Sequence, residues 1–372
     1  MSPVNYRPED FPPADLDWLR LIPLIGPANA AIGGYEGVLR GIPNVDVLLS
    51  PLTSQEAVLS SRIEGTQATL GEVLEFEAEG AQGDESTPKE ADIHEVVNYR
   101  TALSEAKARL GRLPLSQRLL KETHRVLMRG VRGRARSPGK CRRVPNWIGP
   151  HGCTIEEARF IPCPADRLST AMSAWEKYLH ADVPDRLVQL AMVHAEFEAI
   201  HPFLDGNGRL GRLIVPLFLY EKGLLTSPGF YISEYLERNR DAYYERFLAV
   251  SRDGDWTGWA AFFLEALTVQ AKANRERALA IFELYNQRKN WIAETTHSQH
   301  AVRALDWFFN KPIFKTSDFV RTAGIPRPTA NRIVREVRDA GLLIEVRPAS
   351  GRRAAVLAFR ELLNIAEGSE VF

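Results

Sequence analysis

Cysteine is scarce in this sequence. There are three among 372 residues, Cys141, Cys153 and Cys163, an odd number and too few for a disulfide framework. This scarcity favours a reducing compartment. The opening residues, MSPVNYRPED, contain neither a basic stretch nor an apolar run, so they predict no signal peptide.

Long hydrophobic runs are also lacking. The longest, from Leu213 to Tyr220, is far too short to cross a bilayer and contains Pro216. We therefore expect a cytoplasmic protein without membrane-spanning segments. Net charge is absent as well, because 47 Lys and Arg residues balance 47 Asp and Glu residues. That balance excludes a chain that is basic or acidic throughout, but it allows local patches.

Two patches of opposite sign follow one another. Residues 72–95 contain nine acidic residues and one lysine, and residues 107–143 contain thirteen basic residues and one glutamate. Within the acidic patch, residues 80–89 lack apolar periodicity and predict an exposed linker. Single members of the basic patch are typical of solvated helix faces, but as a block they bias their side of the molecule towards anions.

Helical spacing of apolar residues runs through most of the chain. It is clear in residues 91–110, 115–128, 167–179, 185–201 and 209–220. Strand signals are few before the C-terminal residues, so the sequence predicts a mainly α fold. Residues 131–168 differ, because they are rich in glycine and proline and predict a loop with a short hairpin.

One stretch, AIHPFLDGNGRLGRL (residues 199–213), concentrates polar side chains of reactive types. Apolar residues at helical spacing lead up to His201, where Pro202 disfavours helical geometry and ends the helix. The next two residues are apolar and predict a plug in the loop. Residues 205–208 predict a turn, after which a second helix begins.

This arrangement favours phosphate binding. Glycines let the backbone approach a ligand closely, and the N–H groups at the start of the second helix point towards it. Arg209 and Arg212, three residues apart, share a helix face and offer forked donors to one anion. Asp205 is suited to a divalent cation brought by a polyphosphate. His201 is the candidate general base, because imidazole titrates near neutral pH.

Residues Gly206 to Gly211 also satisfy the pattern G-x-G-x-x-G. A dinucleotide-binding fold places that pattern after a strand, whereas a helix is expected before it here. We therefore reject the dinucleotide-binding interpretation. A Walker A lysine motif is absent from the sequence too.

The twelve residues HPFLDGNGRLGR, from His201 to Arg212, resemble the Fic family signature H-P-F-x-[DE]-G-N-G-R-x-x-R at every fixed position. Four other segments are similar to the same family, and the resemblance extends to about Leu267. They are LPLSQRLLKETHRVLMRGVRGR, NWIG, FIPCP and RNRDAYYERFLAVSRDGDW. The resemblance implies a helical Fic core with a small β-hairpin flap. It also implies a protein adenylyltransferase, which moves AMP from ATP to a Ser, Thr or Tyr hydroxyl of a protein and releases pyrophosphate.

The resemblance also implies a role for each residue of the motif. His201 would deprotonate the target hydroxyl, and Asp205 would hold Mg²⁺ on the α- and β-phosphates. The other implied ligands of ATP are Gly206, Asn207 and Gly208 around the phosphates, with Arg209 and Arg212 at the β- and γ-phosphates. Phe203 would anchor the loop in the core. The segment before Phe160 resembles the flap, which aligns the target backbone by strand-like pairing. The implied partners are ATP and a hydroxyl on another protein or on this chain itself, and a homodimer is left open.

A second motif lies upstream, at Ser60 to Gly65 (SSRIEG). Read alone, it predicts a helix turn that ends at a glycine cap. It also fits [ST]-x-x-x-E-[GN], which marks an inhibitory helix in the Fic family, with Ser60 and Glu64 as its fixed residues. By this resemblance Glu64 would pair with Arg212 and remove the guanidinium that orients the γ-phosphate. In some relatives this glutamate helps to remove AMP, so a de-adenylylating enzyme is an alternative.

The C-terminal residues predict a separate unit. Residues 270–289 predict a long charged helix, and from Val302 the order of three helices and two short apolar stretches is typical of a winged helix-turn-helix. Eight arginines face three acidic residues between residues 321 and 353, an excess that suits contact with DNA phosphates. The candidate DNA-contacting residues are Arg327, Arg332, Arg335 and Arg352. Protein contact or dimerisation through this unit is an equal alternative.

We therefore expect four parts: an N-terminal region with the inhibitory helix (1–90), a Fic core (91–268), a linker helix (269–300) and a winged helix-turn-helix (301–372). The leading function is autoinhibited protein adenylylation. The alternative from another class is a transcriptional regulator that uses the winged helix on DNA and the Fic core as a nucleotide sensor. ATP-dependent labelling that is lost in His201→Ala distinguishes the two.

Overall fold

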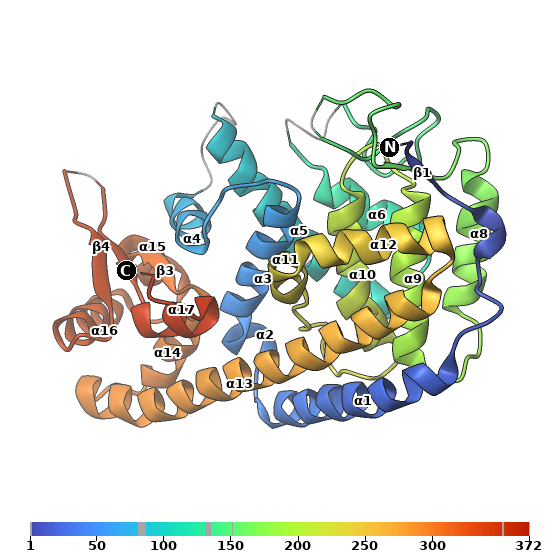
Figure 1. Ribbon diagram of the computed structural model, residues 1–372. Helices are drawn as coiled ribbons and strands as arrows, with labels where there is room; N and C mark the ends of the chain where they lie inside the picture. The colour runs from blue at the N-terminus through green and yellow to red at the C-terminus, as the bar shows by residue number, and fades with distance from the viewer. Residues whose placement is uncertain (1, 81–86, 131–134, 151, 352, 372) are drawn as a thin grey trace. The chain divides into compact units, whose positions relative to one another are not determined.

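The protein is described from a computed structural model that covers residues 2–80, 87–130, 135–150, 152–351 and 353–371 (Figure 1). Contacts within these residues group the chain into two units. The first unit contains Met1–Glu36, Leu59–Thr66 and Asn98–Lys272, and the second contains Gly37–Val58, Gln67–Val97 and Ala273–Phe372. Each unit is therefore assembled from segments that are separated in the sequence.

Helices make up most of the described chain, and its strands are short, so the mainly α fold expected from hydrophobic spacing is confirmed. No helix among the described residues is long and apolar enough to span a membrane.

Two consecutive helices, α9 (Arg186–Ile200) and α10 (Asn207–Glu221), form the centre of the first unit. Residues 187–200 of α9 are all buried, as expected for a helix that is largely apolar around its circumference. Asp185 caps the start of α9, where its carboxylate accepts two backbone N–H groups at 2.9 Å. The loop between α9 and α10 carries the motif that begins at His201.

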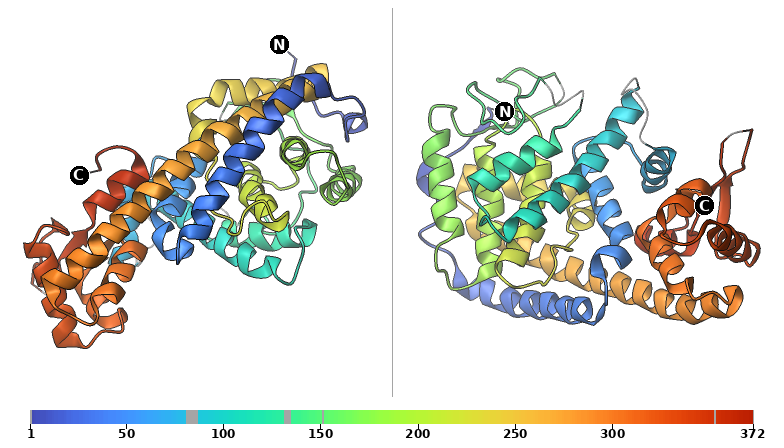
Figure 2. Two further views of the ribbon diagram at one scale, coloured as in Figure 1. Left: turned by 90° about the horizontal axis from the view of Figure 1, so that it is seen from below. Right: turned by 180° about the vertical axis from the view of Figure 1, so that it is seen from behind.

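Other helices enclose this pair. Helices α6 (Gln117–Leu127) and α12 (Arg240–Asp253) lie on opposite sides of it, as the front view (Figure 1) and the back view (Figure 2) show. Helix α8 (Leu168–Leu179) packs along α9, and α11 (Ser233–Arg238) precedes α12. A single 3₁₀ turn, η1 (Pro8–Asp10), is described near the N-terminus.

Four helices contribute residues to both units: α1 (Trp18–Gly41), α3 (Ser50–Ile63), α5 (Pro88–Leu110) and α13 (Trp256–Thr296). Helix α13 is longer than the predicted 270–289. Its sequence contains no proline, and its one glycine, Gly258, lies in the first turn, so nothing in the sequence interrupts the helix. Helix α5 begins within the predicted linker 80–89, of which residues 81–86 lie outside the described residues.

The predicted hairpin segment lies in the first unit. Ile148 forms an antiparallel bridge with Phe160, and the short strand β2 (Phe160–Ile161) also pairs in parallel with β1 (Val4–Asn5). The N-terminal residues therefore cover one edge of β2, and the segment around Ile148 covers the other.

The second unit contains the C-terminal residues together with α2 (Val45–Leu48) and α4 (Leu70–Glu79). Its other elements, in chain order, are α14 (Ala301–Asn310), β3 (Ile313–Lys315), α15 (Thr316–Thr322), α16 (Arg327–Asp339), β4 (Ile344–Arg347), β5 (Val356–Ala358) and α17 (Arg360–Glu367). The strands form an antiparallel sheet in the order β3-β5-β4. Phe308, Phe314 and Phe319 pack their rings together in the core of this unit.

Candidate active site

His201 stands at the end of α9 with a left-handed backbone, φ 51° and ψ 60°. Its Nδ1 lies 3.3 Å from the carbonyl oxygen of Glu198. Because a carbonyl only accepts hydrogen bonds, Nδ1 must carry the proton, and Nε2 is left with a lone pair. Burial lowers the pKa of His201 to about 4, so the ring is neutral at pH 7. The ring is therefore in the state that a general base requires.

The loop after His201 is held in shape by the side chain of Asn207. The side chain of Asn207 accepts a hydrogen bond from the backbone N–H of Phe203 and donates one to its carbonyl, both at 2.9 Å. Phe203 is buried, as the sequence predicts. Asn207 therefore fixes the shape of the loop through its side chain, and its contribution to a phosphate site would come from its backbone N–H at the start of α10.

His124, on α6, holds the same loop and was not singled out from the sequence. Its ring stacks on Phe203, with centroids 3.8 Å apart. Its Nδ1 accepts the backbone N–H of Gly139 at 2.8 Å, so its Nε2 carries the proton and donates to the carbonyl of Asp205 at 2.9 Å. Burial lowers the pKa of His124 to about 4. The sequence signal was a histidine on the mostly apolar face of α6.

The carboxylate of Asp205, in the loop between α9 and α10, is exposed to solvent. The side chain is 43 % exposed, and one oxygen accepts the N–H of Gly206 at 2.6 Å. Gly206 is left-handed, with φ 77°. Among the described residues, no group of three or more His, Cys, Asp or Glu side chains is placed so that it could hold a metal ion. A single exposed carboxylate fits Mg²⁺, which binds one or two protein carboxylates and completes its coordination with substrate phosphates and water.

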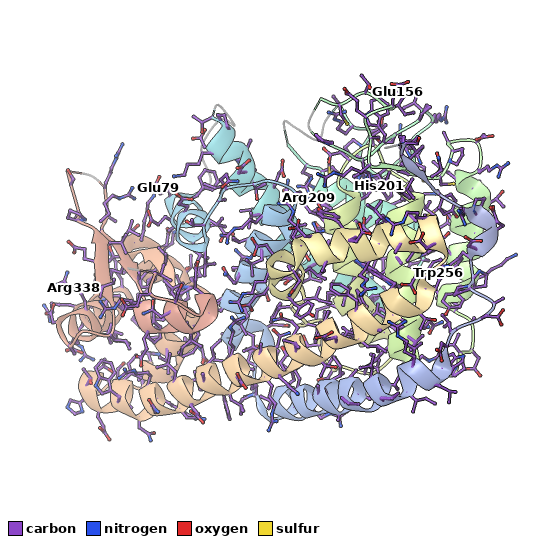
Figure 3. The ribbon with its side chains drawn as sticks, in the orientation of Figure 1. Glu79, Glu156, His201, Arg209, Trp256 and Arg338 are labelled. Atoms are coloured by element: carbon purple, nitrogen blue, oxygen red, sulfur yellow. The ribbon has the colours of Figure 1, made fainter. Side chains whose placement is uncertain are left out.

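Arg209 and Arg212 extend from the first turns of α10 and are both buried. Arg209 lies near the Asp205 carboxylate, with 3.8 Å between the charged atoms, and near the Sδ of Met128. Figure 3 shows Arg209 and His201 at the junction of α9 and α10. The structure therefore brings the predicted base, the predicted metal ligand and the predicted phosphate-binding arginines together at one end of the helix pair.

Arg212 is occupied by the upstream motif. Its Nη2 donates to Glu64 Oε1 at 2.7 Å and to the carbonyl of Ser60 at 2.8 Å, and its Nε donates to Ser60 Oγ at 2.8 Å. Burial raises the pKa of Glu64, but the positive charges of Arg212 and Arg209 outweigh it, and the net shift is downward. The Glu64 carboxylate is therefore ionised at neutral pH.

The Glu64 carboxylate also fills space beside the loop that carries Gly206 and Gly208. A Cβ added to Gly208 would collide with Glu64 Oε1 and would also lie within 3.1 Å of the guanidinium of Arg212. Gly208 thus leaves room at the start of α10, and Glu64 occupies that room.

Two buried polar residues lie behind the site. His194 has its Nδ1 3.2 Å from the carbonyl of Gly211 and its Nε2 3.1 Å from the hydroxyl of Tyr243, and burial lowers its pKa to about 3. His194 is therefore a packed helix histidine. Glu198 packs its carboxyl against Gly211, and burial raises its pKa to about 8. Neither side chain carries a charge at neutral pH.

The predicted DNA-contacting residues belong to the second unit. Arg327 and Arg335 are exposed on α16. Arg332 instead donates to the carbonyl of Thr296 at 2.7 Å and to Glu336 at 3.1 Å. Arg352 lies outside the described residues.

Comparisons with known proteins place most of the first 219 residues in one family. The model of the Fic/DOC family N-terminal region matches residues 22–108, and the Fic/DOC family model matches residues 114–219. A probable protein adenylyltransferase of Aquifex aeolicus is 26 % identical over 209 residues, covering 53 % of this chain and 58 % of that protein. The protein adenylyltransferase Fic of Culex quinquefasciatus is 32 % identical over 130 residues, covering 34 % of this chain and 23 % of that protein. The chain thus spans less than two thirds of these relatives.

Solved structures show the same fold at low sequence identity. A Fic family protein from Desulfovibrio desulfuricans G20 has a TM-score of 0.57 at 20 % identity and covers 91 % of this chain and 95 % of its own. A Fic domain containing signaling protein from Bacteroides thetaiotaomicron has a TM-score of 0.54 at 15 % identity and covers 69 % and 97 %. The two family models together span more than half of the 372 residues. The chain belongs to the Fic/DOC family.

Proposed function

We propose that this protein is an adenylyltransferase that moves AMP from ATP to a hydroxyl group of a protein and releases pyrophosphate. The observation that carries the proposal is the state of His201, a neutral ring with its Nε2 lone pair available beside a glycine loop and two arginines. The names of the Aquifex and Culex relatives support the same activity.

In the proposed reaction, Nε2 of His201 takes the proton of the target hydroxyl. The hydroxyl oxygen then bonds to the α-phosphorus of ATP, the bond from that phosphorus to the bridging oxygen breaks, and pyrophosphate leaves with the electron pair. Catalysis of this kind rests on positioning and on charge stabilisation, with one proton to remove. Mg²⁺, when bound through Asp205, would neutralise charge on the α- and β-phosphates.

The start of α10 supplies the other parts. Its N–H groups and the positive end of the helix dipole favour the phosphates, and Gly206 and Gly208 allow close approach. Arg209 and Arg212 supply fixed positive charge for the β- and γ-phosphates. Since both guanidinium groups are buried, little reorganisation is needed for them to act.

We further propose that Glu64 holds the enzyme in an inhibited state. Its carboxylate neutralises Arg212 and fills the space beside Gly208. The γ-phosphate of ATP can therefore neither pair with Arg212 nor enter that space. ATP that binds in this state would place its α-phosphorus away from the target oxygen, and a small misplacement costs a large factor in rate.

The flap supports docking of an extended target segment. β1 already pairs with one edge of β2, so a target strand must pair elsewhere, and the neighbouring segment that includes Val144 and Trp147 has both side chains exposed. A target backbone that adds to this segment would pass close to the catalytic loop, because Arg142, two residues before Val144, donates to the carbonyl of His201 at 2.8 Å.

The position of a radiolabel in ATP tests the proposed chemistry. The Glu64→Gly protein is incubated with a cell lysate and with ATP labelled at either the α- or the γ-phosphate. We expect protein bands that carry the α label but not the γ label, and His201→Asn in the same background should remove them. Transfer of the γ label would indicate a kinase reaction and would contradict the proposal, as would α labelling that survives His201→Asn.

A further inference from the structure

The exposed face of α16 carries a row of polar side chains that nothing in the active site uses. Arg327, Asn331 and Arg335 follow one another at intervals of four residues, so they share one face of the helix, and all three are exposed. The opposite face is apolar and buried. Its residues are Ala330, Ile333, Val334 and Val337.

These three side chains are available for a partner. None of them makes a hydrogen bond or ion pair with another described residue, whereas Arg332 is held by Thr296 and Glu336. Arg347, on β4, is likewise paired with the carboxylate of Glu79. The structure therefore separates the arginines that stabilise this unit from those that face solvent.

A cavity of about 490 Å³ lies between α15 and α16, next to the row. Five of its six lining residues are polar or basic, namely Thr316, Ser317, Arg321, Arg327 and Asn331, and the sixth is Val320. Arg353, in the turn between β4 and β5, is a further exposed arginine of the same unit. Serine, threonine and arginine side chains are common ligands of the phosphates of nucleic acids.

The connection between α15 and α16 is short. Residues 323–326 join the two helices, and Gly324 adopts a left-handed backbone with φ 66°. A turn of three or four residues that contains glycine is typical of a helix-turn-helix, in which the second helix enters the major groove. The hairpin of β4 and β5 follows α16, as in a winged helix.

We propose that this face binds duplex DNA, with α16 in the major groove. Arg327 and Arg335 have the forked donors that read guanine O6 and N7, and Asn331 has the amide that reads adenine N6 and N7. Ser317 and Arg353 would contact phosphates on either side. An RNA duplex fits poorly, because its major groove is too narrow and deep for a helix.

The composition of the face favours DNA over a protein partner. Protein interfaces are anchored by large apolar and aromatic side chains. The exposed large hydrophobic residues of the described chain include none on α15, α16 or the β4–β5 hairpin. The face therefore has the charge that DNA requires and lacks the apolar anchors that a protein interface requires.

The proposal is tested with the full chain, a fluorescent DNA duplex of mixed sequence and anisotropy at several salt concentrations. We expect binding that weakens as salt rises, because phosphate contacts release counterions. Arg327→Ala and Arg335→Ala should each lower affinity by about tenfold, which corresponds to ~1.4 kcal/mol. Arg360→Ala, at an exposed arginine at the start of α17, removes the same charge outside this face and should leave affinity unchanged.

Three results would overturn the proposal: no binding at low salt, equal losses in Arg360→Ala and Arg327→Ala, or equal affinity for duplex RNA. Each variant is checked by circular dichroism, and since its residue is exposed we expect an unchanged spectrum. His201→Asn should bind DNA as the wild type does, so failure of the proposed enzyme activity and failure of DNA binding are distinguished.

Discussion

Arg212 and Glu64 lie 148 positions apart in the sequence and 2.7 Å apart in the structure. The arginine side chain is 1 % exposed and the glutamate 38 % exposed, so the pair joins a buried cation to a carboxylate at the mouth of the site. This geometry makes Glu64 the removable partner, because the carboxylate can reach water whereas the guanidinium cannot.

Replacing Glu64 should change activity and stability in opposite directions. Glu64→Gly frees Arg212 and the space beside Gly208 for the γ-phosphate, and we expect the rate of AMP transfer to rise by tenfold or more, about 1.4 kcal/mol or more in transition-state stabilisation. The same change leaves a buried guanidinium with Ser60 as its one remaining partner of this motif, so the melting temperature should fall.

Glu64→Gln is the matched control, since it keeps the shape and removes the charge. We expect an intermediate rate, because the amide still fills the space but binds Arg212 more weakly. Initial rates and thermal melts of both variants give the comparison. An unchanged rate in Glu64→Gly would contradict the inhibitory role.

His124 should act as a positioning residue through two separate hydrogen bonds. In His124→Asn the amide oxygen reaches about as far as Nδ1 and can still accept the N–H of Gly139, whereas in His124→Gln the amide nitrogen reaches about as far as Nε2 and can still donate to Asp205. Because Asp205 belongs to the catalytic loop, we expect Gln to retain more transfer activity than Asn, by about three- to tenfold.

If His124 had a purely structural role, the Asn and Gln variants would lose kcat to the same extent. Thermal melts should show similar losses for Asn and Gln, while kcat in the Glu64→Gly background separates them. Equal kcat values for the two variants would show that the bond to Asp205 is not what matters.

Asp205 should set the requirement for Mg²⁺. Chelation by EDTA is expected to stop AMP transfer, and Asp205→Asn should raise the Mg²⁺ concentration for half-maximal rate by about tenfold or more, because a neutral amide is a weaker ligand for a hard cation. Asparagine can still accept the N–H of Gly206, so the loop is retained. Asp182→Asn, at a fully exposed position, is the control. An unchanged Mg²⁺ dependence in Asp205→Asn would refute the assignment.

Buried histidines should make the protein less stable in mild acid. Burial lowers the pKa of His124 and His201 to about 4 and of His194 to about 3, from 6.5. Below pH 6.5 the unfolded chain binds protons on these rings and the folded chain does not. The free energy of unfolding therefore falls as the pH drops from 6.5 towards 4.

Buried glutamates act in the opposite direction. Burial raises the pKa of Glu196 and Glu198 to about 8, from 4.5, so above pH 4.5 the unfolded chain releases protons that the folded chain keeps. The three histidines outweigh the two glutamates well below pH 6.5, and the glutamates prevail increasingly above it, as the unfolded histidines lose their protons. We expect a stability maximum near pH 6.5.

Urea unfolding across this pH range measures the maximum. Glu196→Gln should flatten the decline above pH 6.5, because the amide cannot ionise while its oxygen still accepts the hydroxyl of Tyr6, at 2.6 Å in the wild type. A stability that rises steadily from pH 6.5 to 8 would be incompatible with neutral, buried carboxyl groups.

The local chemistry of the site could be predicted from the sequence because it is contained in one stretch. Pro202 locates the end of α9, and the turn that follows locates the start of α10, so His201 and Arg209 must lie close together. The role of Asn207 was less accessible. Whether its side chain faces a ligand or the loop depends on Phe203, whose position is set by packing against His124.

Long-range relationships were harder to predict. Leu59–Thr66 belongs to the first unit, whereas the segments on either side of it belong to the second. This grouping depends on tertiary contacts that no periodicity of the sequence encodes. Arg332 and Arg335 have the same residue type and lie one turn apart, yet Thr296 and Glu336 engage the first and leave the second exposed. Only the packing of α16 distinguishes them.

Peptide mass spectrometry of a lysate tests catalysis by His201 and inhibition by Glu64 together. The lysate is incubated with ATP and one of three proteins: wild type, Glu64→Gly, or Glu64→Gly with His201→Asn. We predict AMP on Ser, Thr or Tyr side chains with Glu64→Gly, far less with wild type and none with the double variant. Equal modification by wild type and Glu64→Gly, or AMP transfer by the double variant, would contradict an inhibited adenylyltransferase in which His201 is the base and Glu64 restrains Arg212.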